Sequence, residues 1–167
     1  MGGPVAIVGY MGSGKSTVGR MLARSLGWDF VDLDREISRQ AGRAIPEIFK
    51  ISGEAQFRDL EHRALLVTLD GKRRRVIACG GGIVERPDNR ANLTAIPTVF
   101  LREDIGVLFG RTRDAQRPLR AAGRKEFERR YERRLPLYEQ VADLEVDVRG
   151  RPPAAVAKEI ERWISRA

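Results

Sequence analysis

The sequence predicts an α/β fold: a five-stranded, mainly parallel sheet with helices on both faces. Five short strand candidates are each followed by helical sequence, which is the pattern of parallel β–α units. The first candidate, at 5–8, is apolar at every position, as expected of a strand buried on both faces. The length of 167 residues fits a single domain at 1–167, and no linker-like composition divides it.

The strands are predicted where apolar runs meet residues that end a strand. The first runs into a glycine-rich loop at 9–14, the second ends at an aspartate and the third at three glycines. In chain order the expected strands are 5–8, 30–32, 75–79, 98–101 and 144–148.

The helices are predicted from apolar residues at three- and four-residue spacing and from the residues that bound a helix. Gly27 suits a C-cap, Gly42 marks another helix end, and Pro46 suits a first helical turn. In chain order the expected helices are about 15–26, 34–40, 44–49, 53–70, 87–93, 104–112, 125–141 and 153–166.

The composition is basic, with 31 basic and 23 acidic residues and a net charge of +8. Only five of the basic residues are lysines, and the planar fork of arginine suits carboxylate and phosphate groups. Ten basic and four acidic residues fall between Arg111 and Arg134, so most of the excess is local. The charge predicts an anionic partner, which is a nucleic acid, a phosphate or a carboxylate metabolite.

Other features exclude whole classes of protein. No run of 18 apolar residues exists, which argues against a membrane partner. The one cysteine, Cys79, excludes a disulfide scaffold and ends an apolar strand, where we expect a small buried residue. The first residues resemble no signal segment, and we expect a cytoplasmic protein. No extended apolar patch is indicated, and we expect a monomer.

The segment Gly9-Tyr10-Met11-Gly12-Ser13-Gly14-Lys15-Ser16 matches the phosphate-loop pattern G-x-x-x-x-G-K-[ST] between a strand and a helix. Glycines let the backbone curl so that successive N–H groups point at phosphate oxygens, and the helix N-terminus adds partial positive charge. We expect Lys15 to reach the β- and γ-phosphates, Ser16 to ligate Mg²⁺ and Thr17 to contact the α-phosphate. The motif indicates a nucleoside triphosphate but not the acceptor.

Further short motifs follow the phosphate loop at the ends of predicted strands and downstream. In chain order they are Asp32-Leu33-Asp34, Phe57-Arg58, Gly80-Gly81-Gly82, Arg117-Pro118-Leu119 and Arg134-Leu135-Pro136-Leu137-Tyr138. Several of them have a plainer structural explanation when taken alone. Asp34 could cap the next helix, Gly80 to Gly82 could form only a turn, and Arg58 could pair with Glu61.

Taken together and in this order, the motifs resemble the shikimate kinase family over almost the whole chain, from Val5 to about Ile164. The resemblance implies transfer of the γ-phosphoryl of ATP to the 3-hydroxyl of shikimate, in aromatic amino-acid biosynthesis. It implies a three-layer P-loop kinase fold of the nucleoside monophosphate kinase group. Within it, a helical substrate-binding region would lie at about 33–61 and a lid at about 112–124.

The resemblance also implies a role for each matched residue. Asp34 would contact the shikimate hydroxyls and is the family's proposed base, while Arg58 and Arg134 would grip the carboxylate. Gly80, Gly81 and Gly82 would pack against the substrate, and Asp32 would hold Mg²⁺ through water beside Ser16. The implied ATP-binding set, with Lys15 and Arg117 also catalytic, is Gly12, Ser13, Gly14, Lys15, Ser16, Thr17, Arg111, Arg117 and Pro153.

Some points stay open at this stage. Asp34 could be a general base or only an orienting group, Arg120 could join Arg117 at the phosphates, and Pro152 could replace Pro153 at adenine. A P-loop kinase for another polyol acid such as gluconate, or for a nucleoside monophosphate, is a near alternative. A nucleic-acid-binding P-loop NTPase is a remote one, since no basic-aromatic interleaving or helix-turn-helix pattern accompanies the charge.

Overall fold

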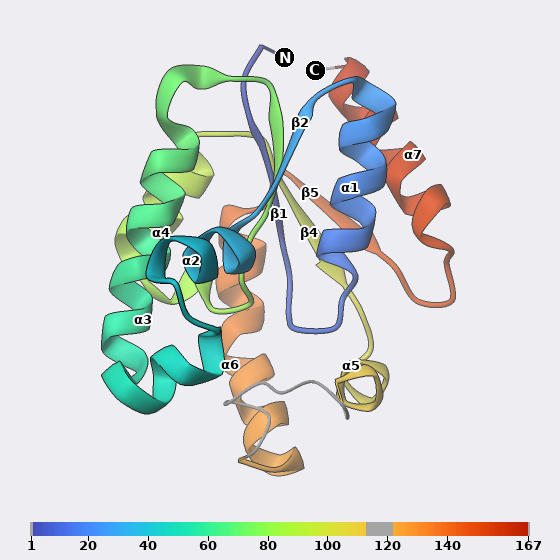
Figure 1. The fold of residues 1–167 in the computed structure, drawn as a ribbon. Coiled ribbons are helices and arrows are strands. Elements are labelled where there is room, and N and C mark those ends of the chain that lie inside the picture. Colours follow the sequence, from blue (N-terminus) through green and yellow to red (C-terminus); the bar gives the residue numbers. More distant parts are fainter. Residues whose placement is uncertain (1, 113–121, 167) are drawn as a thin grey trace.

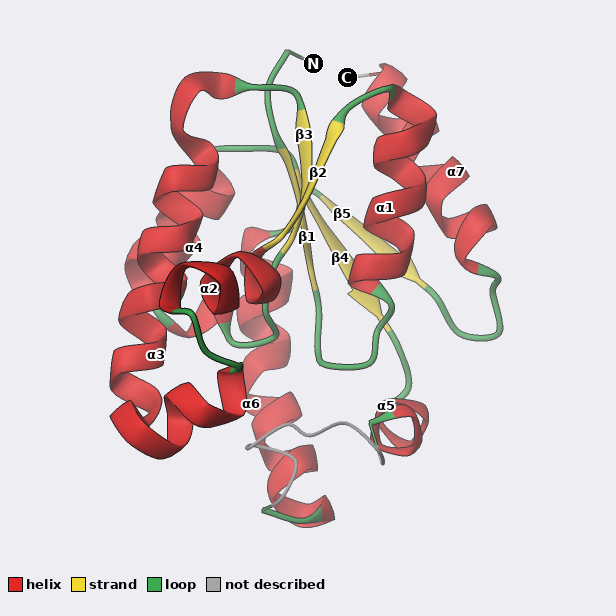
Figure 2. Ribbon diagram, in the orientation of Figure 1, coloured by secondary structure: helices red, strands yellow, loops and turns green. Residues whose placement is uncertain are grey.

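The computed structural model describes residues 2–112 and 122–166 and contains one central sheet (Figure 1). Its strand order is β2-β3-β1-β4-β5, and every neighbouring pair is parallel. Helices cover both faces of the sheet (Figure 2). This arrangement confirms the α/β class and the five parallel strands that the sequence predicts.

The observed elements lie close to their predicted positions. The strands are β1 (Val5–Val8), β2 (Asp29–Asp32), β3 (Arg75–Ala78), β4 (Thr98–Arg102) and β5 (Leu144–Asp147). The α-helices are α1 (Lys15–Leu26), α2 (Leu33–Ala41), α3 (Ile45–Leu69), α4 (Pro87–Thr94), α5 (Ile105–Arg111), α6 (Arg124–Val141) and α7 (Pro153–Arg166). Two short 3₁₀ helices, η1 (Asp70–Lys72) and η2 (Ile83–Glu85), flank β3.

Two apolar layers hold the sheet between its helices. Helices α1 and α7 pack against each other and bury one face with residues such as Leu22 and Ile160. Helices α2, α3, α4 and α6 cover the other face, around residues such as Ile37, Leu65 and Tyr138 (Figure 1). Strand β1 lies between β3 and β4, and all four of its residues are fully buried, as its unbroken apolar sequence predicts.

Helix α3 contains the two helices that the sequence predicts at about 44–49 and 53–70. They meet at a kink, within one continuous helical run, and not across a loop. Gly53 interrupts its geometry with a φ of 77° and a ψ of 175°. A residue with a side chain adopts this backbone conformation only at a cost, so glycine permits the break without ending the run. Elsewhere the strand and helix ends differ from the predicted ends by at most one residue.

None of the helices in the two described ranges combines the length and the apolar character that a membrane span requires.

Close packing of α1 on the sheet predicts the cost of a β-carbon at Gly19. An added β-carbon would lie 2.8 Å from the Phe30 ring and 3.4 Å from Ile7. Overpacking of this kind costs roughly 1–3 kcal/mol, more than the roughly 1 kcal/mol that alanine gains over glycine in a helix. We expect Gly19→Ala to lower the free energy of unfolding in urea titrations.

The matched control is Gly110→Ala in α5, because a β-carbon there meets nothing within 4 Å. That variant should leave stability unchanged or raise it by up to about 1 kcal/mol. Equal effects of the two substitutions would contradict the packing explanation.

Candidate functional site

The loop after β1 has the backbone geometry of a phosphate cradle. Gly12 and Gly14 have φ angles of 83° and 92°, which L-residues with side chains rarely adopt. These conformations turn the chain into the first turn of α1, where free N–H groups and the helix dipole favour an anion. The ammonium of Lys15 donates to the Tyr10 carbonyl oxygen at 2.8 Å, which holds the side chain across the loop.

A cleft of about 410 Å³ opens on this loop. Its lining includes every nucleotide- or metal-binding residue that the sequence predicts within the described ranges: Gly12, Ser13, Gly14, Lys15, Ser16, Thr17, Asp32, Arg111 and Pro153. Of the two candidate prolines, Pro153 lines the cleft, whereas Pro152 is not among the described residues that line it. The fold thus brings together residues from the loop after β1 and from α1, β2, α5 and α7.

Ser16 and Asp32 form one polar pair at the floor of the cleft. The Ser16 hydroxyl donates to Asp32 Oδ2 at 2.6 Å. Asp32 Oδ1 accepts from the backbone N–H of Arg35 at 3.3 Å, so Asp32 is the N-cap of α2. The alternative in which Asp34 caps this helix is therefore wrong, and Asp34 lies in the first helical turn.

These two oxygen donors fit Mg²⁺. Magnesium keeps several waters and takes one or two protein oxygens together with substrate phosphates. The described residues contain no cluster of three or more acidic, histidine or cysteine side chains that would form an all-protein cage. A hydroxyl beside a carboxylate at a phosphate loop is the donor set that a phosphate-bound magnesium ion needs.

A second, smaller pocket of about 60 Å³ adjoins the cleft. It contains all the acceptor-site residues that the sequence predicts, together with two aromatic rings. Its lining is Met11, Asp34, Ile45, Phe49, Phe57, Arg58, Glu61, Gly80, Gly81, Gly82 and Arg134.

Asp34 and Gly81 line both spaces, so the two pockets meet at these residues. Gly80 brings the backbone close to the Asp34 carboxylate, since a β-carbon at Gly80 would lie 2.8 Å from Asp34 Oδ1. The Gly80 to Gly82 segment is thus a packed wall of the site as well as a turn. A group held by Asp34 would face the end of the phosphate cleft.

Arg58 is both a pocket residue and a partner of Glu61. Its Nη1 donates to Glu61 Oε2 at 2.8 Å and its Nη2 to Glu54 Oε1 at 3.0 Å. The Arg58 side chain is only 12% exposed, which excludes a freely solvated arginine. Burial raises the pKa of the Glu61 carboxyl, although the positive charge of Arg58 opposes the shift.

Arg134 comes from α6, far along the chain, and is almost completely buried. Its Nε donates to Glu85 Oε1 at 2.6 Å, and its guanidinium carbon lies 5.6 Å from the centre of the Tyr10 ring. Tyr138, one helical turn further on, donates its hydroxyl to the Gly81 carbonyl oxygen. Helix α6 is thereby joined to both the phosphate loop and the glycine run.

Arg111 lies at the other end of the cleft. Its Nη1 lies 3.1 Å from Glu103 Oε2 and donates to the Gly12 carbonyl oxygen at 3.3 Å. The predicted lid residue Arg117 and its neighbour Arg120 lie outside the described residues, as does most of the expected lid at 112–124.

Sequence reasoning assigned no role to several residues at the site. Val148, Arg151 and Val156 line the nucleotide cleft, and their only sequence signal is their closeness to Pro153. Glu61 was considered only as a partner of Arg58. Glu85 was not singled out, although a charged residue so soon after three glycines is a usable signal. Cys79 is buried, as predicted, and burial raises the pKa of its thiol.

A phosphate loop at the carboxyl edge of a five-stranded parallel sheet, joined to a small pocket with two arginines, defines a P-loop phosphotransferase. The comparisons with known proteins narrow this class. A family model described as shikimate kinase matches residues 11–165. This chain therefore belongs to the shikimate kinase family.

Individual relatives agree with the family match. The chain is 45% identical over 164 residues to a shikimate kinase of Gloeobacter violaceus, covering 95% of this chain and 90% of the relative. It is 39% identical over 158 residues to one of Persephonella marina, covering 93% and 95%. A solved shikimate kinase of Acinetobacter baumannii in complex with shikimate superposes with a TM-score of 0.93 at 34% identity, covering 98% and 93%.

Asp32 caps α2 and also contacts Ser16, so we expect that different substitutions of Asp32 can affect stability and metal binding independently. Asn caps a helix as well as Asp does, so Asp32→Asn should keep the thermal stability of the ligand-free protein. It should weaken Mg²⁺-dependent ATP binding by about tenfold, because an uncharged amide attracts the ion and its bound water less than a carboxylate does. Asp32→Ala should lose both the ATP affinity and about 1 kcal/mol of stability.

Calorimetric titration of ATP with and without Mg²⁺, beside thermal unfolding, checks this prediction. Unchanged Mg²⁺-dependent affinity in Asp32→Asn would show that the carboxylate has no part in metal binding.

Proposed function

We propose that the protein transfers the γ-phosphoryl of ATP to the 3-hydroxyl of shikimate, giving shikimate 3-phosphate and ADP in aromatic amino-acid biosynthesis. The observation that carries the proposal is the junction of a phosphate-loop cleft with a pocket that holds two arginines and one aspartate. Two arginine forks suit a carboxylate, and an aspartate suits ring hydroxyls. Membership of the shikimate kinase family supports the same assignment.

On the nucleotide side, the chain's task is to hold and neutralise phosphate. The loop N–H groups of Gly12 to Thr17 bind the phosphates, and the Lys15 ammonium stabilises charge on the transferring group. Ser16 would hold Mg²⁺ directly and Asp32 through water; when bound, the ion neutralises charge on the β- and γ-phosphates. Arg111 and Pro153 would enclose the adenine, a role supported by their place on the cleft wall.

On the acceptor side, the residues orient the hydroxyl for an in-line approach. Arg58 and Arg134 would bind the carboxylate, Gly80 to Gly82 would pack against the ring, and Asp34 would accept a hydrogen bond from the reacting hydroxyl. Because phosphoryl transfer has a largely dissociative transition state, placing that oxygen matters more than removing its proton early. The position of Asp34 at the junction serves either role.

We extend the proposal to the lid and the setting of the enzyme. Arg117, in a lid at about 112–124, would close on the phosphates and exclude water. The enzyme would act as a cytoplasmic monomer of one domain, with ATP and shikimate as partners and without nucleic acid. The exposed large apolar residues of the described ranges, which are Met21, Ile51, Leu66, Val67 and Val107, are spread over three helices.

A coupled ADP-release assay tests the proposed reaction. With Mg²⁺ and ATP, we expect shikimate to raise ADP production far above the background ATPase rate. Nucleoside monophosphates should leave it near background, because the small pocket and its paired arginines suit a compact carboxylate. Gluconate is also a small carboxylate, and we expect it to leave ADP production near background because the chain belongs to the shikimate kinase family. Equal stimulation by gluconate, or none by shikimate, would refute the proposal for a sample shown to be folded.

The contact between Gly82 and Arg58 predicts a variant that displaces the arginine without removing it. A β-carbon at Gly82 would lie 2.2 to 2.4 Å from three guanidinium atoms of Arg58. The φ of Gly82 is −99°, which alanine adopts without strain. We expect both Gly82→Ala and Arg58→Ala to raise the KM for shikimate about tenfold or more, since charge-assisted bonds are lost.

In steady-state kinetics with each substrate varied, the KM for ATP should change little in both variants. A normal KM for shikimate in Gly82→Ala would show that the Arg58 position is not critical.

A further inference from the structure

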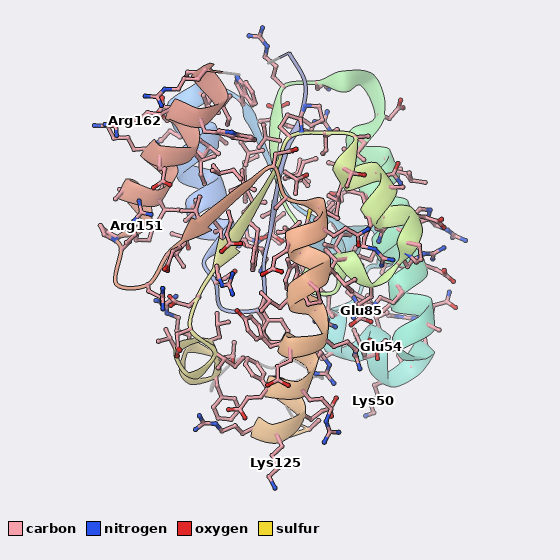
Figure 3. All side chains as sticks on the ribbon, turned by 180° about the vertical axis from the view of Figure 1, so that it is seen from behind. Lys50, Glu54, Glu85, Lys125, Arg151 and Arg162 are labelled. Atoms are coloured by element: carbon pink, nitrogen blue, oxygen red, sulfur yellow. The ribbon has the colours of Figure 1, made fainter. Side chains whose placement is uncertain are left out.

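Glu85 is a charged residue at the edge of the acceptor pocket with no role in the mechanism above. It ends η2, three residues after the Gly80 to Gly82 run. Figure 3 shows it between the ribbons of α6 and the α3 region. Among the described residues Glu85 does not line the acceptor pocket, whereas its partner Arg134 does.

The contact between Glu85 and Arg134 is short and well shielded. Glu85 Oε1 accepts from Arg134 Nε at 2.6 Å, and the Arg134 side chain is 1% exposed. The neighbouring Arg133 is 60% exposed, and its Nη2 lies 3.6 Å from the same oxygen. Glu85 is therefore chiefly the counter-ion of Arg134. A charge-assisted bond in a buried setting restrains the guanidinium more than a surface ion pair does.

The bond also determines which edge of the guanidinium is available. An arginine presents its N–H groups in a rigid planar fork. With Nε engaged by Glu85, the remaining donors of Arg134 are on its two terminal nitrogens, close to the Tyr138 hydroxyl. Nη2 is buried and has no hydrogen-bond partner among the described residues. Nη1 lies on the Gly81 side, 3.8 Å from the position of a β-carbon there.

The pairing of charges around the acceptor pocket also indicates that Glu85 acts on Arg134. Arg58 and Arg134 both line one small pocket, and buried charges are costly unless each is paired. Glu61 pairs with Arg58, and Glu85 pairs with Arg134. Partial burial favours the neutral form of Glu85, but the positive charges of Arg134 and Arg58 outweigh it and lower the pKa of this carboxyl.

We propose that Glu85 is a positioning residue, which orients Arg134 so that its terminal N–H edge receives the carboxylate of the acceptor. The inference rests on the proposed function, since it assumes that the acceptor is a carboxylate. Glu85 itself does not contact the acceptor. Its effect is confined to the binding of the acceptor carboxylate and spares the ATP site.

Glu85→Ala and Glu85→Gln test the proposal. We expect Glu85→Ala to raise the Kd and KM for shikimate about tenfold, with kcat and the KM for ATP within about twofold of wild type. Glu85→Gln keeps an acceptor oxygen at the same place and should recover most of the affinity. The matched control is Asp59→Ala, whose carboxylate pairs with Arg86 at 2.5 Å and does not line the pocket in the described part.

The methyl ester of shikimate separates positioning from general damage. The ester lacks the carboxylate charge, so Glu85→Ala should weaken its calorimetric binding far less than it weakens that of shikimate. Equal losses for acid and ester, a loss of kcat without a change in Kd, or an unaffected Glu85→Ala would overturn the proposal. If Glu85→Ala fails to fold, the test is made with Glu85→Gln. We expect this variant to lose a smaller part of its affinity for shikimate and to keep its affinity for the methyl ester. An equal loss of affinity for shikimate and for the ester would overturn the proposed role of Glu85.

The outcomes also separate this inference from the proposed function. A wild-type protein that binds shikimate but releases no ADP would refute the proposed function. The role of Glu85 would still be tested by comparing the binding of shikimate and its methyl ester. An active wild type with unaffected Glu85 variants would overturn only the role of Glu85. A wild type that binds no shikimate would overturn both.

Discussion

The parallel pairing of β1 with β3 and β4 is the constraint on which the site depends. Ala6 is opposite Ile77 on one side and Thr98 on the other, and Ile7 is opposite Ala78 and Val99. Because paired strands run in one direction, their carboxyl ends meet at one edge of the sheet. The phosphate loop follows β1 and the Gly80 to Gly82 run follows β3, while Asp32 is the last residue of β2, which pairs with β3 in parallel. Burial of β1 on both faces makes this register costly to shift.

The acceptor pocket is a case of buried charge held by compensation. Two arginines, Arg58 and Arg134, line a pocket of about 60 Å³. Each of them forms an ion pair with a glutamate, Arg58 with Glu61 and Arg134 with Glu85. Removing one partner would leave an uncompensated charge in a poorly solvated place. Full neutralisation would also leave little attraction for an anion. The geometry keeps buried N–H groups of Arg58 and Arg134 without hydrogen-bond partners in the described part, so an anionic ligand can still gain by binding there.

Close approach of the backbone connects the two halves of the site. The glycine run after β3 packs against Asp34 and the Arg58 guanidinium, at distances that any β-carbon would violate. The Tyr138 hydroxyl bonds to Gly81, and the Tyr10 hydroxyl donates to the Phe127 carbonyl oxygen at 3.0 Å. Helix α6, which carries Arg134, is thus tied to the glycine run at one end and to the phosphate loop at the other.

Much of the architecture follows from local sequence. Apolar runs, helix-bounding residues and the phosphate-loop spacing determined the order of elements and the nucleotide cleft, because these signals depend on neighbouring residues. The order of short motifs determined the family. Only the tertiary structure decided that Asp32 rather than Asp34 caps α2, and that Glu85 holds Arg134 across 49 residues. Such contacts depend on how distant helices pack against one sheet, and no local spacing encodes that distance.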